Sequence, residues 1–441
     1  MHFSRPALKL FLAAFVLYNL NCRPIPSGDT VTAALLPLQV VLHGSVDLDA
    51  WRPYLASSYG GSTYFLHERN SHYYSAYPIA QPLLLTPLYT PLLLVPEMRA
   101  WPVPTLVLLA RVLEKLMASL IAAASVAFLF LLLLRLTTPR RALLLAGVYA
   151  FATNVCSTSS QALWQHGAGQ LATVLSLLCL AIFQERAGWR AAAGAGLFAA
   201  LSVAMRPSDV LFLAASCAVL LWGDRRVRLL AWYAGFGALI GGALALYNWL
   251  TFGSLRGGYP QAFDGAFWPG LAALTVSPSH GLFVYSPVLL FALAGVYFCR
   301  RRISPILIIA LLFSLAHLLL YANWPFWWGG DCYGPRMMAD VLPALVLLIL
   351  PALNWIGRHR PLRAAFAASL VFSIAVQLVG VFSFPLGFRL PEPFWDWSRC
   401  PIVSNARQGP TLAPYRVVAG WANDLLHGRR PDTQHTGLLI R

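Results

Sequence analysis

The stretch Leu116–Leu136, LMASLIAAASVAFLFLLLLRL, decides the fold class of this chain. Its only charged residue is Arg135, beside its end, and its only other polar residues are two serines. About 20 apolar residues in a helix cross the hydrocarbon core of a bilayer, and such a helix satisfies its own backbone hydrogen bonds. The stretch therefore predicts a membrane-spanning helix.

Similar apolar stretches recur along the 441 residues, of which 58% are hydrophobic and only 11% charged. A soluble domain usually carries about 25% charged residues, so this composition indicates lipid as the main solvent. The sequence predicts an all-α polytopic membrane protein with about 11 transmembrane helices. The predicted crossings are Ala7–Asn21, Leu116–Leu136, Ala142–Asn154, Gly169–Phe183, Ala191–Met205, Val210–Trp222, Leu229–Leu250, Phe283–Phe298, Pro305–Tyr321, Val341–Ile356 and Ala364–Phe384.

The formal net charge of +16 orients the chain in the membrane. With these crossings, one side carries 16 basic and two acidic residues in short connections, and the other carries 16 basic and 14 acidic residues. By the positive-inside rule, the first side is cytoplasmic. We therefore expect a cytoplasmic N-terminus, a non-cytoplasmic C-terminal tail over 385–441, and no nucleic-acid partner.

The longest outer segment is the loop 22–111, which lies within a predicted transmembrane domain over 1–384. We expect it to carry amphipathic helices, the first over Thr30–His43 with Asp29 as its N-cap. Four cysteines fall on the predicted outer side, where disulfides are possible but no pairing can be deduced: Cys22, Cys156, Cys332 and Cys400.

Asp29 is the first candidate catalytic residue. It follows the first crossing closely, so its carboxylate is expected at the membrane rim. One interpretation is a simple helix cap. The other is a general base whose pKa is raised by partial burial.

Two further groups of charged residues allow alternative interpretations. Arg206 and Asp209 lie at the outer junction of two crossings, where the arginine either pairs with Asp209 or binds a phosphate with its planar guanidinium. Asp47 and Asp49 are weak candidate ligands for a divalent cation, and a solvated surface is the commoner explanation for such a pair.

The loop Asn323–Arg336 concentrates aromatic, glycine and charged residues within one helix connection. Trp327, Trp328 and Tyr333 are candidates to contact a sugar or lipid, and Arg336 to bind its phosphate. An ordinary interfacial aromatic belt is the alternative. His280 is a candidate second polar contact, or else a hydrogen-bonded structural histidine.

Several of these strings together resemble the integral-membrane glycosyltransferases of the GT-C fold. These include protein O-mannosyltransferases, lipid A aminoarabinose transferases and bacterial lipopolysaccharide-core transferases. The resemblance covers most of 1–384. It rests on Pro26-Ser27-Gly28-Asp29-Thr30, on Tyr77-Pro78 with Gln81-Pro82, and on the strings Trp-Trp-Gly-Gly and Tyr-Gly-Pro-Arg within 327–336. The proline element lacks the basic residue that usually precedes it in the aminoarabinose transferases, which leaves the donor open.

The resemblance implies an enzyme of the bacterial inner membrane that moves a hexosyl or pentosyl group from a polyprenyl-phosphate donor. The acceptor would be a glycan, lipid or protein on the periplasmic side, and the transfer would invert the anomeric centre. Asp29 would be the catalytic base, and Arg206 and Arg336 would bind the donor phosphate. No cofactor is implied with certainty, and a divalent cation is possible. The alternatives are a lipid-linked sugar flippase or transporter, and an O-antigen polymerase or ligase.

Overall fold

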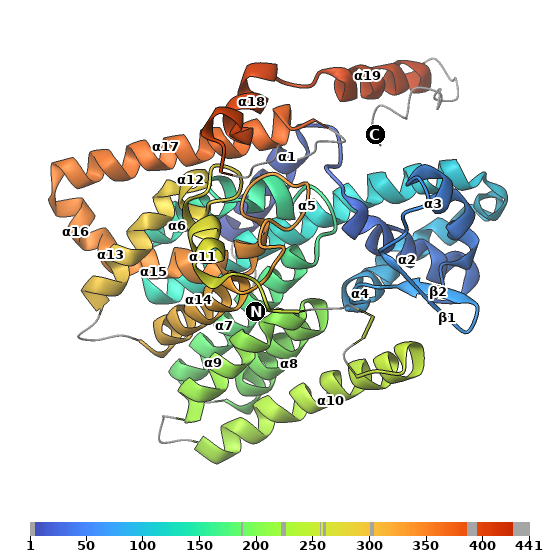
Figure 1. Ribbon diagram of the computed structural model, residues 1–441. Coiled ribbons are helices and arrows are strands. Elements are labelled where there is room, and N and C mark those ends of the chain that lie inside the picture. Colours follow the sequence, from blue (N-terminus) through green and yellow to red (C-terminus); the bar gives the residue numbers. More distant parts are fainter. Residues whose placement is uncertain are drawn as a thin grey trace.

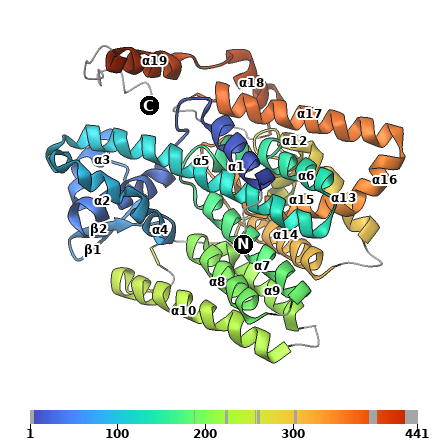
Figure 2. The ribbon, with the colours of Figure 1, turned by 180° about the vertical axis from the view of Figure 1, so that it is seen from behind.

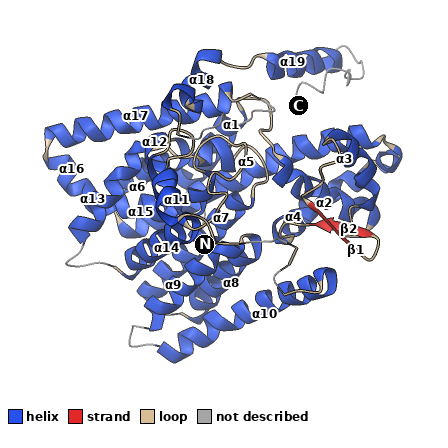
Figure 3. Ribbon diagram, in the orientation of Figure 1, coloured by secondary structure: helices blue, strands red, loops and turns tan. Residues whose placement is uncertain are grey.

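The computed structural model describes residues 5–186, 188–221, 226–255, 257–258, 262–299, 304–385 and 395–426. Helices dominate these residues, and their only strands form one short hairpin (Figure 3). The helices are α1 (Arg5–Asn19), α2 (Val31–His43), α3 (Arg52–Ser58), α4 (Ala80–Tyr89), α5 (Val103–Leu136), α6 (Pro139–Phe151), α7 (Gln165–Arg186), α8 (Trp189–Met205), α9 (Val210–Leu221), α10 (Arg226–Phe252), α11 (Phe267–Val276), α12 (Leu282–Tyr285), α13 (Leu290–Cys299), α14 (Pro305–Ala322), α15 (Leu342–Ile349), α16 (Leu353–Arg358), α17 (Arg360–Ser383), α18 (Pro401–Gln408) and α19 (Ala413–Leu426), and the strands are β1 (Leu66–Arg69) and β2 (His72–Ser75).

Within the described residues, six helical segments are long and apolar enough to cross a membrane: Val103–Leu136, Gln165–Arg186, Leu230–Phe252, Pro305–Ala322, Arg336–Arg358 and Arg360–Ser383. Four shorter apolar helices accompany them: Trp189–Met205, Pro207–Leu221, Phe267–Val276 and Pro287–Phe298. The predominantly helical class is thus confirmed, whereas the number of 11 crossings stays a prediction.

Several predicted boundaries were wrong. The predicted crossing Leu116–Leu136 is only the second part of α5, which has 34 residues and begins at Val103. The predicted crossing Phe283–Phe298 is broken around Pro287, between α12 and α13, because proline lacks the amide hydrogen that a continuous helix needs.

α5 connects the two parts of the molecule. At 1.5 Å per residue its 34 residues extend about 50 Å, well beyond the roughly 30 Å of a hydrocarbon core. Its first turns lie beside a lobe made of α2, α3, α4 and the hairpin, and the rest enters a bundle that includes α1, α6 and α7 (Figures 1 and 2). The bundle is tightly packed, since a side chain at Gly295 of α13 would overlap the carbonyl of Leu348 in α15.

The lobe corresponds to the predicted outer loop, with two differences. α2 forms where a helix was expected, but ten of its 13 residues are buried, so it is a core helix of the lobe and is not amphipathic. The hairpin was not predicted. Its strands pair antiparallel from Leu66 opposite Ser75 to Arg69 opposite His72, and its turn places Asn70 and Ser71 at φ of 51° and 64°.

Candidate functional site

Asp29 lies between α1 and α2, in a single helical turn over Gly28–Thr30. The expected capping role is wrong, because the side chain of Ser27 caps this turn by accepting from the Asp29 backbone N–H at 3.1 Å. The Asp29 carboxylate points elsewhere. Its Oδ1 accepts hydrogen bonds from the hydroxyls of Tyr64 at 2.9 Å and Tyr77 at 2.6 Å.

The hairpin explains why these two tyrosines meet at one oxygen. Tyr64 precedes β1 and Tyr77 follows β2. Pairing of the strands brings the ends of the hairpin together, and the pairing continues through Ala76, whose N–H donates to the Phe65 carbonyl at 2.9 Å. A hydrogen bond between Ser75 and Thr32 of α2, 2.8 Å long, fixes the hairpin beside the Asp29 turn.

Arg336 completes the surroundings of Asp29 from the other end of the chain. It begins a helical turn over Arg336–Val341, and its Nη1 donates to Asp29 Oδ2 at 2.6 Å. Its guanidinium lies 4.4 Å from the centre of the Trp164 ring, a cation–π arrangement that fixes the plane of the group.

The electrostatics of Asp29 differ from the sequence-based expectation. Burial of its carboxyl raises the pKa, as expected, but the Arg336 charge and the hydrogen bonds from Tyr77, Arg336 and Tyr64 outweigh burial, so the pKa lies below its ordinary value. Asp29 is therefore ionised at neutral pH and is held as one half of an ion pair.

A cavity of about 300 Å³ opens beside this pair. Asp29, Tyr64, Trp164 and Arg336 contribute to its wall, together with Gly329–Asp331 and the chain at 25–28 and 384–385. Gly329 and Gly330 have φ of 72° and 85°, a left-handed conformation that glycine adopts without strain, so the backbone can turn at the wall of the cavity. The volume falls at the lower end of the range for small-molecule sites.

Arg206 does not line this cavity. Its Nε donates to Asp340 Oδ2 at 2.6 Å and one Nη to the Tyr321 hydroxyl at 2.6 Å. The expected pair with Asp209 is wrong, since Asp340 takes its place and also contacts His166 Nδ1 at 2.9 Å through Oδ1. The turn over Arg336–Val341 thus presents Arg336 to the cavity and Asp340 to the bundle interior.

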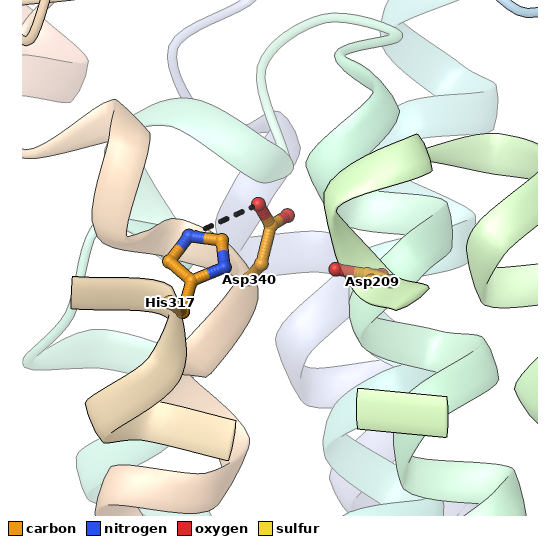
Figure 4. A group of neighbouring side chains, drawn as sticks. All are labelled: Asp209, His317 and Asp340. Atoms are coloured by element: carbon orange, nitrogen blue, oxygen red, sulfur yellow. Dashed lines mark ion pairs between the residues drawn. The ribbon is translucent and has the colours of Figure 1, made fainter. Parts of the chain in front are cut away.

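Asp340 also belongs to the group that best fits a metal among the described residues. Ligand atoms of Asp209, His317 and Asp340 lie within 4.8 Å of one another, and all three side chains are buried (Figure 4). Both carboxylate oxygens of Asp209 lack a hydrogen-bond partner. Two carboxylates and an imidazole are a donor set that Zn²⁺ accepts, although Arg206 already compensates Asp340.

The pair Asp47 and Asp49 offers less to a cation. Asp49 Oδ1 accepts from the Tyr73 backbone N–H at 2.7 Å, and Oδ2 contacts His72 Nδ1 at 2.6 Å. One of the two carboxylates is therefore used to anchor the hairpin.

The aromatic candidates and His280 are not among the residues that line the cavity. Tyr333 is buried and its hydroxyl donates to the Val376 carbonyl of α17 at 2.8 Å. The centre of the Trp327 ring lies 5.7 Å from that of Trp328 and 6.4 Å from that of His280. His280 is itself buried, which lowers its pKa to about 3 and keeps it neutral.

Sequence reasoning therefore selected Asp29 and Arg336, which the fold brings together, but missed Tyr64, Tyr77 and Trp164. Tyr77 stands in the quoted Tyr-Pro string, yet nothing in the sequence places it at Asp29. The possible disulfides are not formed, because Cys22, Cys156, Cys332 and Cys400 are all free thiols.

The helical fold and its six long apolar helices define the class, an all-α protein suited to a membrane. No protein-family model matches the sequence, and a comparison with curated proteins finds no match.

Proposed function

We propose that the chain is a GT-C-like membrane glycosyltransferase that moves a sugar from a polyprenyl-phosphate donor to an acceptor hydroxyl on the periplasmic side of a bacterial inner membrane. The observation that carries the proposal is the Asp29–Arg336 pair on one cavity wall. A carboxylate and a guanidinium there supply the two groups that such a transfer needs, a base for the acceptor and a positive charge for the phosphate.

In the proposed reaction, Asp29 takes the proton of the acceptor hydroxyl while the acceptor oxygen attacks the anomeric carbon. The bond from that carbon to the phosphate oxygen breaks, and the polyprenyl phosphate leaves with the electron pair towards Arg336. Attack opposite the leaving group inverts the anomeric centre.

The ion pair suggests how the base becomes active. As long as Arg336 is bound to Asp29, it lowers the pKa of the carboxyl and so weakens the base. A donor phosphate that draws the Arg336 guanidinium away would end this lowering of the Asp29 pKa. Burial, which raises the pKa, would remain. Donor binding would thus strengthen the base just when the leaving group is in place.

The alternatives place different demands on the same cavity. A flippase or transporter needs the charged pair for binding but no base. The Tyr64 and Tyr77 hydroxyls favour the enzyme, because they hold one carboxylate oxygen in a fixed position. A polymerase or ligase uses related chemistry and differs only in the acceptor.

The decisive experiment measures sugar transfer by the purified protein and its Asp29→Asn variant, with a polyprenyl-phosphate sugar as donor and membrane glycolipids as acceptors. Loss of a general base costs about 10²–10⁴-fold in rate, so transfer by the variant should almost disappear. Asp264→Asn is the matched control, because Asp264 is exposed and lies outside the cavity. Movement of the donor across liposomes without transfer would instead identify a flippase.

A further inference from the structure

A second cavity, of about 220 Å³, shares no lining residue with the Asp29 cavity. Its wall includes Leu108, Arg111, Val112, Lys115 and Leu116 of α5. Their spacing of three, four, seven and eight residues places them on one face of the helix. The end of α1 and the residues that follow it form another part of the wall, and Val418 of α19 a third.

Three buried cations line this cavity, and two of them have no acidic partner. Arg111 is neutralised by Glu114, with Nη1 to Oε2 at 2.7 Å. Lys115 donates to three neutral oxygens, and Arg23 donates through Nη2 to the Phe384 carbonyl at 2.5 Å. Arg23 is only 2% exposed, and its Nη1 has no hydrogen-bond partner.

An uncompensated charge costs several kcal/mol when it is buried, and charged residues inside a membrane usually mark a functional site. Arg23 thus calls for an anion in this cavity, and Lys115 lies on the same wall. The rest of the wall is mainly apolar, and Leu116 is 36% exposed on the outside of the bundle. A ligand with an anionic head and an apolar tail satisfies both parts of the wall.

We infer that this cavity binds the phosphate of a lipid, with Arg23 Nη1 as the free donor, Lys115 as the compensating charge, and the chains lying along Leu116. The site is separate from the Asp29 cavity and does not depend on the proposed transfer. The lipid is either a membrane phospholipid or a polyprenyl phosphate, which share this chemistry.

The test is native mass spectrometry of the full-length protein in detergent with three added lipids: phosphatidylglycerol, diacylglycerol with the same acyl chains, and undecaprenyl phosphate. Binding of one or both phosphate lipids, and not of diacylglycerol, is expected. The preferred phosphate lipid identifies the source. Equal binding of diacylglycerol would overturn the inference, because the phosphate would then contribute nothing.

Variants locate the binding. Arg23→Gln and Lys115→Gln should each weaken phosphate-lipid binding about fivefold, as expected for about 1 kcal/mol per basic residue. Arg23→Lys should retain most of it. Arg99→Gln, which changes an exposed cation outside the cavity wall, is the control. Unchanged affinity in Arg23→Gln and Lys115→Gln, with thermal unfolding as in the wild type, would place the lipid elsewhere.

Asp29→Asn should leave this lipid binding intact, so a failure of the transferase proposal can be distinguished from a failure of the lipid-binding proposal.

Discussion

At the scale of single residues, the candidate site depends on how Asp29 is charged. Its carboxyl is partly buried, which alone would raise its pKa, yet Arg336, Tyr64 and Tyr77 stabilise the ionised form. Because the folded pKa lies below the ordinary value, the contribution of Asp29 to stability is present above that ordinary value and is lost as the pH falls through the folded pKa.

This balance predicts a pH effect of Arg336→Gln. The variant removes the main influence that lowers the pKa of Asp29, whereas burial remains and raises it. We expect the acidic limb of the pH–rate profile to move to higher pH, in addition to a loss of rate. Tyr77→Phe should move it in the same direction by less, because one hydrogen bond is lost and no charge. An acidic limb that stays in place in both variants would contradict the role of Asp29 as the base.

Arg336→Lys tests the shape of the cation separately from its charge. An ammonium cannot lie flat on the Trp164 ring, nor can it present the planar fork that suits a phosphate. We therefore expect Arg336→Lys to bind a polyprenyl-phosphate analogue more weakly than the wild type, measured by titration of the purified protein. The paired control Arg407→Lys changes an exposed arginine and should bind normally.

Arg206 was also predicted to bind the donor phosphate, but it does not line the cavity and instead forms a buried ion pair with Asp340. Removing one partner of a buried ion pair leaves the other uncompensated and costs about 3–5 kcal/mol. We expect Asp340→Asn and Arg206→Gln to lower the free energy of unfolding by roughly this amount, because each partner is buried in the bundle. Denaturation of the purified variants measures it. Should Arg206→Gln keep its stability but lose donor binding, the phosphate role would be restored.

At the scale of elements, the hairpin of β1 and β2 positions two side chains of the site, although its own residues do not line the cavity. Its turn holds Ser71 at φ 64°, a conformation that β-branched residues adopt only under strain. The strands in turn position Tyr64 and Tyr77. A local change at the turn should therefore reach Asp29 through the pairing of β1 and β2.

Ser71→Val is expected to destabilise the hairpin by about 1 kcal/mol and to lower the transfer rate, whereas Ser71→Gly should be neutral or stabilising. Hydrogen exchange of the Leu66–Ser75 amides measures the first effect, and the activity assay measures the second. Faster exchange without any loss of transfer would show that the two tyrosines do not depend on the hairpin.

At the scale of the whole molecule, the topology is a separate question from the fold. The length and apolar composition of the helices do not determine which side of the membrane each loop faces. The basic clusters predict a cytoplasmic N-terminus and a periplasmic C-terminus. Some of them, such as Arg300–Arg302, lie outside the described residues. Reporter fusions after Arg302 and after Arg441 should therefore report opposite sides of the membrane. The same side for both would require an even number of crossings between the two fusion points, whereas the predicted topology has three there.

The sequence alone determined the class of the protein, because hydropathy and backbone hydrogen bonding are local properties that sum along a helix. It also identified Asp29 and Arg336 as candidate site residues, because a charged residue beside an apolar segment is energetically costly and therefore suggests a function. Only the tertiary structure decided their partners. The two residues are 307 positions apart, and their ion pair exists because the turns over Gly28–Thr30 and Arg336–Val341 fold against the same cavity. Likewise, Arg206 meets Asp340 rather than its sequence neighbour Asp209, since packing of the bundle sets which charges share the interior.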